Sequence, residues 1–393
     1  MLIAIFIFGF FLSTFRITGA LTLSYLLLFA FLLTSIIKMK RVKVKLVDLF
    51  PLLLLIKFIV DFANGNVSNS NITNYISLLF FWSCYFMYRN SNIAFNLKHI
   101  NLFLNLSIAH AFLLIFQFAL FNLFDNFTLL NPFGNFSAYG PDPQSIVPSA
   151  YNPALQIIRR PNGLNWEPSA AGFWGIFALV TLINYSNKVK NFKFKLLIIT
   201  LGTLSTFSFL AIVTTTFLIT IFLLKQSKHR NLFRVILVIT IVPSFIYFGT
   251  EAYNLLSLRL GETSIEGSSG FIRVAAPLSL FHDGVGIIGN AFLADKAYQL
   301  LPQFDASGRN EFSGIANTYL EYLYYFGVAG GFMLICLIRE TYTKTSLLST
   351  IALSSTLIFG GYLFNPIYFY SALIFLALQS SENFEHKSNS LTT

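Results

Sequence analysis

The chain has 393 residues, of which 55% are hydrophobic and only 11% are charged, and its mean hydropathy is +0.68. A soluble domain carries about 25% charged residues, so this composition excludes an ordinary soluble protein and indicates one embedded in a membrane. The net charge of +10 does not indicate nucleic-acid binding, because most of the excess lies in short segments between apolar runs and no basic face with interleaved aromatics occurs in a water-facing domain.

Apolar runs that could cross a membrane recur along the chain, and a span needs roughly 20 such residues. The apolar start, residues 1–15, has no basic segment before it and no A-x-A-like site after it, so we expect a retained first helix rather than a signal peptide. Residues 1–121 are predicted to hold transmembrane helices 1–5, in the runs Leu2–Ser13, Ile17–Ile37, Leu46–Val60, Tyr75–Tyr88 and Ile100–Phe121.

Ionisable side chains inside such runs are functional candidates by default. Lys57 and Asp61 are four residues apart, so they share one helix face and can pair. Because they stand near the end of their run, we interpret Lys57 as snorkelling to the membrane boundary. We expect His110, in mid-span, to hydrogen-bond a neighbouring helix, with a proton relay as the alternative.

Residues 122–169 form a long loop with Pro, Gly and Asn throughout, and residues 170–248 return to apolar runs. The run Leu196–Leu224 is too long for one span, and basic clusters flank it on both sides. If both clusters are cytoplasmic, as the positive-inside rule expects, this run must cross the membrane twice, with a turn near residues 205–208. We therefore predict transmembrane helices 6–9 in residues 170–248, within Ala170–Tyr185, Leu196–Leu224 and Val235–Phe248.

Residues 249–314 form a second, larger loop, and loops of this length are usually either functional or disordered. Transmembrane helices 10–12 are predicted in residues 315–379, and residues 380–393 are predicted to be a cytoplasmic tail. The sequence thus predicts an all-α polytopic membrane protein with about 12 transmembrane helices and two large loops on the external face. The last three runs are Ile315–Ile338, Leu347–Gly360 and Ile367–Leu378.

The type of cation differs between the long and the short loops. Five of the six cationic side chains in the two long loops are arginine, whereas the short loops carry mainly lysine. Arginine presents a planar fork of donors that fits phosphate and carboxylate oxygens in a bidentate manner. The long loops therefore indicate an anionic, lipid-associated substrate at the external face of the membrane, and their arginines are Arg159, Arg160, Arg259, Arg273 and Arg309.

Three charged residues stand just before the Ala170 run: Arg159, Arg160 and Glu167. One interpretation is an anion clamp with a carboxylate held at the membrane boundary. The alternative is that Glu167, Pro168 and Ser169 simply cap the start of a helix.

In the second long loop, His282 and Asp283 are a candidate pair for proton handling, because histidine titrates near neutral pH. The following Gly284 leaves a second interpretation open, since Asp-Gly favours a tight turn. No ligand spacing typical of a metal site occurs, so we expect neither a metal nor another cofactor.

A helix is predicted to begin near Asn317, and Glu321 lies one turn inside it, where an isolated carboxylate would be costly. Glu321 is therefore expected to have a partner. Gly327, Gly330 and Gly331 are expected to permit close approach of another helix.

These features together resemble the O-antigen polymerase (Wzy-type) family, which is related to the O-antigen ligases. The resemblance covers nearly the whole chain, with about twelve spans and two large periplasmic loops. Some members have an arginine, fifteen residues and then a glycine in each periplasmic loop, a spacing that Arg159 and Gly175 share with Arg273 and Gly289. The local patterns are Arg160-Pro-Asn-Gly-Leu-Asn-Trp-Glu167-Pro-Ser before one span and Asn317-x-x-Leu-Glu-x-x-x-x-x-Gly327-x-x-Gly330 at the start of another.

The resemblance implies a glycosyltransferase of the bacterial inner membrane whose active site faces the periplasm. Its donor would be a polymer on undecaprenyl pyrophosphate, its acceptor a single lipid-linked repeat unit, and its partner a chain-length regulator protein. On this basis we expect substrate binding by Arg159, Arg259, Arg309, Asn317 and Glu321. Catalytic roles are expected for Glu167, our first choice for the base, and for Arg160, Arg273, His282 and Asp283.

Two alternative functions stay open. Ligases tend to place a histidine just before the helix that begins here near Asn317, and this chain has Ala316 and Asn317 there instead. A polysaccharide flippase or exporter can also have about twelve spans. Such a transporter should concentrate polar residues at the midplane and show repeat symmetry, whereas this chain concentrates them in its outer loops.

Overall fold

The computed structural model describes helices and short connections from both ends of the sequence, in two compact units. The first unit comprises Met1–Asn105, Phe133–Gly140 and Ala276–Thr393, and the second comprises Leu106–Pro132 and Pro141–Ala275. The described residues are 7, 16–18, 21–39, 42, 44–67, 69–91, 96–129, 159–165, 168–226, 278, 281, 285–290, 317–344, 346–360 and 372–373.

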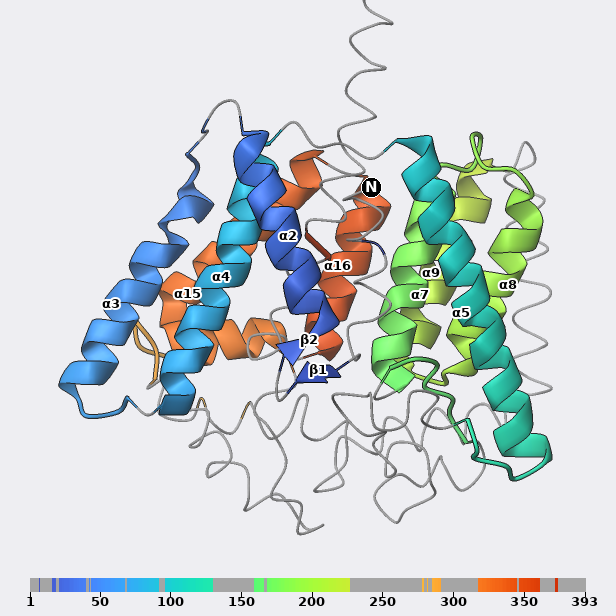
Figure 1. Ribbon diagram of the computed structural model, residues 1–393, viewed down its shortest axis with the longest axis horizontal. Coiled ribbons are helices and arrows are strands. Elements are labelled where there is room, and N and C mark those ends of the chain that lie inside the picture. The colour runs from blue at the N-terminus through green and yellow to red at the C-terminus, as the bar shows by residue number, and fades with distance from the viewer. Residues whose placement is uncertain are drawn as a thin grey trace, which may run out of the picture. The chain divides into compact units, whose positions relative to one another are not determined.

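The first unit is a helical bundle with one small pair of strands. In this bundle α2 and α3 pack on α4, while α15 packs on α3, on η1 and on α16, so helices from the two ends of the sequence share one core (Figure 1). Its elements are β1 (Arg16–Thr18), β2 (Leu21–Thr22), α2 (Leu23–Ile37), η1 (Leu46–Leu49), α3 (Phe50–Ala63), α4 (Asn69–Arg89), α15 (Thr318–Lys344) and α16 (Leu347–Phe359).

Local sequence explains several helix starts in this unit. Pro51 occupies the first turn of α3, where its missing N–H has no helical partner to lose. The hydroxyl of Ser346 accepts a hydrogen bond from the backbone N–H of Ser349 and so caps α16. Such a cap satisfies one of the donors that a helix start leaves unpaired.

The second unit is built around α7 (Pro168–Asn184), which packs against α8 (Phe192–Ser205) and α9 (Phe209–Gln226). Almost every residue of α7 is buried, as expected of a central helix that is apolar on all sides. Close packing depends on glycine, because a Cβ at Gly175 would lie 2.1 Å from Oγ1 of Thr203. Residues 106–123 of the long helix α5 (Leu97–Leu123) also belong to this unit.

The turn predicted near residues 205–208 is confirmed. α8 ends at Ser205 and α9 begins at Phe209, and Phe207 between them has a positive φ of 46°. Two helices joined by so short a connection form an antiparallel hairpin, as the basic clusters on both sides of the run required.

The structure bears on the predicted spans only in part. Among the described residues, two helices are long and apolar enough to cross a membrane, Leu97–Leu123 and Thr318–Thr343, and shorter apolar helices accompany them. The number of twelve spans therefore stays a prediction. The predicted runs 2–13, 235–248 and 367–378 lie outside the described residues, apart from residues 7, 372 and 373.

One detail of the predicted fold is corrected. The described elements are helical, as predicted for an all-α protein, except that β1 and β2 pair as a short antiparallel hairpin. As a result α2 begins at Leu23 rather than at Ile17, where its apolar run starts. Apolar residues alone do not distinguish a strand from the first turn of a helix when the run is short.

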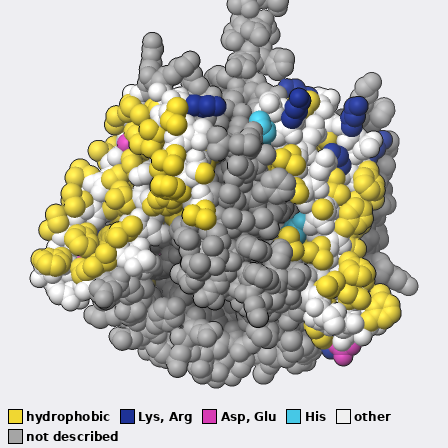
Figure 2. All heavy atoms as spheres, in the orientation of Figure 1, with side chains coloured by type: hydrophobic (Ala, Val, Ile, Leu, Met, Phe, Trp, Pro, Cys, Tyr) yellow, Lys and Arg dark blue, Asp and Glu magenta, His cyan; other side chains and the backbone are white. Residues whose placement is uncertain are grey.

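The outward faces of the helices are apolar. Figure 2 shows hydrophobic side chains gathered over α3, and its exposed residues include Leu52, Leu55, Ile59 and Phe62. An exposed stripe of this size is unusual on a water-soluble monomer. It fits contact with lipid tails.

A network of four charges joins three elements of the first unit. Arg89, at the end of α4, forms ion pairs with Asp48 of η1 and Glu340 of α15, and Glu340 also pairs with Lys45 at 2.8 Å. The side chains of Arg89, Asp48 and Glu340 are at most 5% exposed. The two cations and two anions balance, and removing buried Arg89 should be far costlier than exchanging a pair for apolar residues. Lys45 is 40% exposed, so removing it should cost little.

Candidate functional site

The segment of residues 159–165 follows the first long loop and is attached to α5 by two amide side chains. Asn122 donates to the backbone C=O of Arg159 at 2.8 Å and accepts from its N–H at 2.7 Å. Gln117 makes the same two-way pair with Gly163, donating at 3.2 Å and accepting at 2.7 Å. Each side-chain amide therefore pairs with both backbone groups of one residue, and together the two amides fix the backbone on either side of Arg160.

The same segment closes on itself and on His110. Leu164 donates its backbone N–H to Nε2 of His110 at 3.3 Å, so this nitrogen is the unprotonated one. The side chain of Asn162 donates to the C=O of Asn165 at 2.6 Å, and the N–H of Asn165 returns to the C=O of Asn162 at 3.0 Å. In these contacts the partners of His110 lie in the 159–165 segment rather than in a neighbouring helix.

Gly163→Ala should destabilise the protein more than Gly65→Ala does. Both glycines have a positive φ, 61° and 66°, but a Cβ at Gly163 would lie 2.2 Å from Nε2 of buried His110, whereas nothing lies within 4 Å of one at Gly65. The backbone strain is thus matched, and the overlap should add about 1–3 kcal/mol. Thermal unfolding of the purified variants in detergent measures the difference, and equal melting temperatures would contradict the placement of His110.

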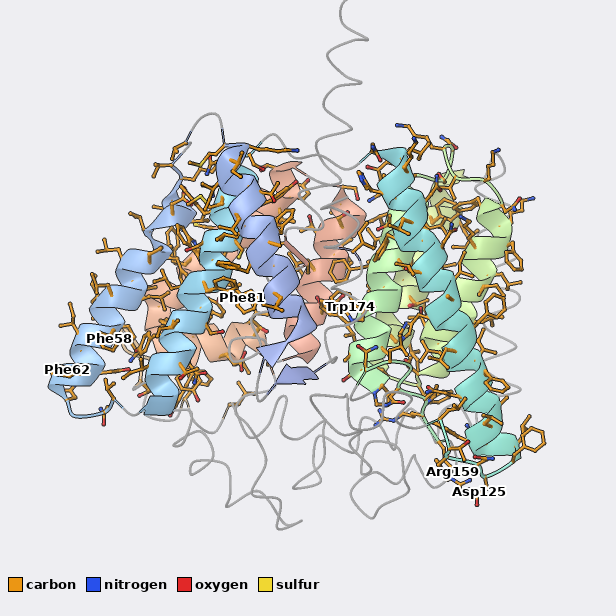
Figure 3. All side chains as sticks on the ribbon, in the orientation of Figure 1. Phe58, Phe62, Phe81, Asp125, Arg159 and Trp174 are labelled. Atoms are coloured by element: carbon orange, nitrogen blue, oxygen red, sulfur yellow. The ribbon has the colours of Figure 1, made fainter. Side chains whose placement is uncertain are left out.

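Arg159 and Arg160 have different surroundings. Nη1 of Arg159 lies 2.9 Å from Oδ1 of Asp125, and its guanidinium faces the ring of Phe127 at 5.6 Å. Figure 3 shows Arg159 and Asp125 side by side at one end of α5. This pair is partly exposed, with side chains 31% and 69% accessible. Arg160 is buried, with 8% of its surface exposed, so it is the arginine whose position the segment defines.

In the first unit, Asn317 and Glu321 stand at the start of α15, as predicted. Oδ1 of Asn317 accepts from the backbone N–H of Leu320 at 3.2 Å, so this side chain caps the helix. Glu321 is only 1% exposed. Thr318 donates both its N–H and its hydroxyl to the C=O of Gly360 beyond α16, which ties this helix start to the neighbouring helix.

The glycines of α15 serve a different purpose from the one predicted. α15 is interrupted at Gly327, which has φ 64° and ψ −156°, and its two halves run in different directions (Figure 1). A Cβ at Gly330 would collide with Phe326 of the preceding turn, 2.3 Å away, and Gly331 has only Leu323 in ordinary contact. Gly327 and Gly330 therefore accommodate a break in the helix, and the close neighbour at Gly327 is a loop and not a helix.

Lys57 and Asp61 are both buried. Their side chains are 1% and 3% exposed and pair at 3.0 Å, and the hydroxyl of Tyr75 on α4 donates to the other oxygen of Asp61 at 2.8 Å. The ring of Phe58 covers Tyr75 edge-on at 5.4 Å. The snorkelling interpretation is wrong, because the packing of α3 on α4 and α15 encloses this pair.

The remaining predicted site residues are Glu167, Arg259, Arg273, His282, Asp283 and Arg309, and they lie outside the described residues. The structure therefore does not test their roles. In the part of the chain that is described, no group of three or more His, Cys, Asp or Glu side chains could hold a metal ion.

Sequence reasoning missed the amides and the buried charges that hold these segments. Gln117 lies seven residues after His110, so both occupy one face of α5 two turns apart, a polar stripe that could have been noticed in an apolar helix. Tyr75, Arg89 and Glu340 carry no such signal, because their partners come from other helices.

Comparison with known proteins identifies the family. The family model described as WcaD colanic acid polymerase matches residues 1–379. No curated protein and no solved structure matches the chain. Because the match covers nearly the whole sequence and agrees with the resemblance drawn from the two loop motifs, the chain belongs to the WcaD colanic acid polymerase family, a family of Wzy-type polysaccharide polymerases.

Proposed function

We propose that the protein is an inner-membrane glycosyltransferase that polymerises lipid-linked repeat units at the periplasmic face. The family match over residues 1–379 is the observation that carries this proposal. The donor would be the growing glycan on undecaprenyl pyrophosphate, and the acceptor a single lipid-linked repeat unit.

The ends of α7 support the proposed orientation. The 159–165 segment with its two arginines precedes α7, and Lys188, Lys190 and Lys193 follow it. A helix of 17 residues is about 25 Å long, close to the thickness of the hydrocarbon core. Arginine on one side and lysine on the other agree with a cytoplasmic lysine cluster and a periplasmic arginine segment.

The chemistry balances without a metal or a cofactor. A hydroxyl oxygen of the acceptor's terminal sugar attacks the anomeric carbon of the donor's reducing-end sugar. The bond from that carbon to the pyrophosphate oxygen breaks, and undecaprenyl pyrophosphate leaves with the electron pair. We propose that Arg160 stabilises the charge that develops on the leaving pyrophosphate, and that Glu167 accepts the proton of the hydroxyl. Arg273, His282 and Asp283 are further proposed participants from the second loop.

The family description also bears on the product. It names a colanic acid polymerase, so we propose a surface polysaccharide of that class as the product, with O-antigen as the second candidate. A chain-length regulator protein is the proposed partner.

A deletion strain should attach at most one repeat unit to its surface lipid and make no polymer. A ligase deletion would instead leave long polymer stranded on undecaprenyl pyrophosphate, and a flippase deletion would trap intermediates on the cytoplasmic side. Gel analysis of the surface polysaccharide and mass spectrometry of extracted lipid-linked sugars distinguish the three. Stranded long polymer would refute the polymerase assignment.

A further inference from the structure

A six-residue piece of the second long loop, residues 285–290, packs into the break in α15, and we call it the docking segment. The C=O groups of Gly286 and Ile287 accept from the N–H groups of Val328 and Ala329, both at 3.2 Å. On the other side of the break, the N–H of Asn290 donates to the C=O of Tyr324 at 2.8 Å. The docking segment therefore supplies backbone partners to both helix ends that the break creates.

These contacts provide hydrogen-bond partners that membrane lipid could not provide. A helix interrupted within a bilayer leaves backbone donors and acceptors that lipid cannot satisfy, and such breaks persist only where protein or water supplies partners. The break also leaves no room for side chains, since a Cβ at Gly289 would lie 2.4 Å from the nitrogen of Gly327 and a Cβ at Gly327 would lie 2.1 Å from the oxygen of Gly286. The backbone of the docking segment therefore packs directly against the backbone of α15.

A buried lysine holds the far end of the docking segment. Nζ of Lys57 donates to the backbone C=O of Asn290 as well as to Asp61. Asp61 balances the ammonium charge and is itself held by Tyr75. A hydrogen bond from a charged donor is stronger than a neutral one, and this one joins α3 to a loop 233 residues further along the sequence.

The ion pair alone does not account for this arrangement. Lys57 and Asp61 are one turn apart on the same helix, so they could pair without any contact to the loop. A charged pair buried this deeply is seldom more stable than apolar residues of the same volume. What apolar residues could not supply is a donor for the C=O of Asn290.

We propose that Lys57 is a positioning residue that anchors the docking segment to α3, with Asp61 and Tyr75 holding its ammonium group in place. The proposal rests on the proposed function, because the second long loop contains Arg273, His282 and Asp283, and the last two immediately precede the docking segment in sequence. Fixing residues 285–290 against α3 and α15 sets the point from which these residues extend. Phe281, just before His282, packs edge-on against Tyr324 at 5.9 Å, so both flanks of residues 282–284 are attached to the same tyrosine.

The structural test is hydrogen–deuterium exchange of the full-length protein in nanodiscs. The double variant Lys57→Met/Asp61→Asn removes the donor to Asn290 without leaving a buried charge unpaired. Peptides covering residues 285–290 and 324–329 should exchange at least about tenfold faster, as expected from the loss of one charge-assisted hydrogen bond. Lys45→Met removes a lysine that is 40% exposed from the other ion-pair network and leaves Lys57, Asp61 and Tyr75 intact, so it should exchange these peptides more slowly than the double variant. Peptides from α7 and α16 report whether the fold is intact.

Polymer synthesis is then compared at matched membrane expression. The proposal predicts that the double variant loses at least about nine-tenths of its polymer, while Lys45→Met keeps wild-type ladders. Wild-type exchange of the docking-segment peptides in the double variant would overturn the anchoring role, whatever the ladders show. Faster exchange with full ladders would overturn the positioning role. If the deletion strain shows that the protein is not a polymerase, the exchange result still decides whether Lys57 holds the docking segment.

Discussion

Gly289→Ala should abolish polymer synthesis, whereas Gly286→Ala, three residues earlier in the same docking segment, should leave it close to wild type. Gly289 has a φ of 78°, and its Cβ would lie 2.4 Å from the nitrogen of Gly327 and 2.6 Å from the carbonyl carbon of Tyr325. These neighbours are backbone atoms, so no side-chain rotation can relieve the overlap. The strained φ and the overlap together should cost at least roughly 3 kcal/mol, enough to expel the docking segment from the break.

Gly286 is a matched control because it has the same residue type in the same segment without either constraint. Its Cβ would meet only the nitrogen of Gly289, at an ordinary 3.8 Å, and its φ is not in the left-handed region. Alanine there should change stability by within about 1 kcal/mol. Polymer ladders and membrane expression of both variants give the comparison. Equal ladders from the two variants would mean that the packing of residues 285–290 against α15 does not matter for synthesis.

The helices themselves were largely predictable, because apolar length and basic flanks are local features. The turn between α8 and α9 is the clearest case. It was predicted from the requirement that Lys188–Lys195 and the basic residues after Leu224 lie on one side, and the helices end and begin where that requirement places them. The hairpin of β1 and β2 was missed, because residues 16–22 continue into an apolar run that a helix explains equally well.

The contacts that organise the candidate site were not predictable, because their partners are distant in the sequence. Lys57 meets Asn290 across 233 residues, and Arg89 meets Glu340 across 251. A single sequence contains no signal for such pairs, so the interpretation of Lys57 as snorkelling rests only on its place near the end of an apolar run. This interpretation is wrong because the neighbouring helices bury Lys57.

The arginine–glycine spacing marks two structurally important glycines but does not indicate what they contact. Gly175 and Gly289 lie at the same spacing after Arg159 and Arg273. In the structure both are sites of close contact, Gly175 with Thr203 of α8 and Gly289 with the break in α15. The spacing therefore places a loop arginine a fixed distance along the chain from a point where the backbone is firmly packed.

Arg160→Lys should lose at least about tenfold in polymer synthesis, while Arg159→Lys should lose much less. A lysine keeps the charge but not the bidentate fork, and losing one or two charge-assisted contacts to pyrophosphate, at about 1.5–3 kcal/mol each, accounts for that loss. Arg160 is buried in a segment whose backbone is fixed by Asn122 and Gln117. The backbone therefore cannot move to bring the ammonium group of a lysine into the position of the guanidinium.

Arg159→Lys distinguishes the two roles that Arg159 could have, with Asp125→Asn as its control. The guanidinium of Arg159 pairs with Asp125, and an exposed ion pair of this kind contributes about 0–1 kcal/mol. If Arg159 serves that pair, Asp125→Asn and Arg159→Lys should both retain long ladders. If Arg159 binds substrate, Asp125→Asn should retain activity or increase it by releasing the guanidinium, whereas Arg159→Lys should fail like Arg160→Lys.

The proposed role of Arg160 would be refuted if Arg160→Lys made full-length ladders at matched membrane expression. Lysine cannot bind two pyrophosphate oxygens through a planar fork, so an arginine that lysine can replace does not stabilise the leaving group in that way.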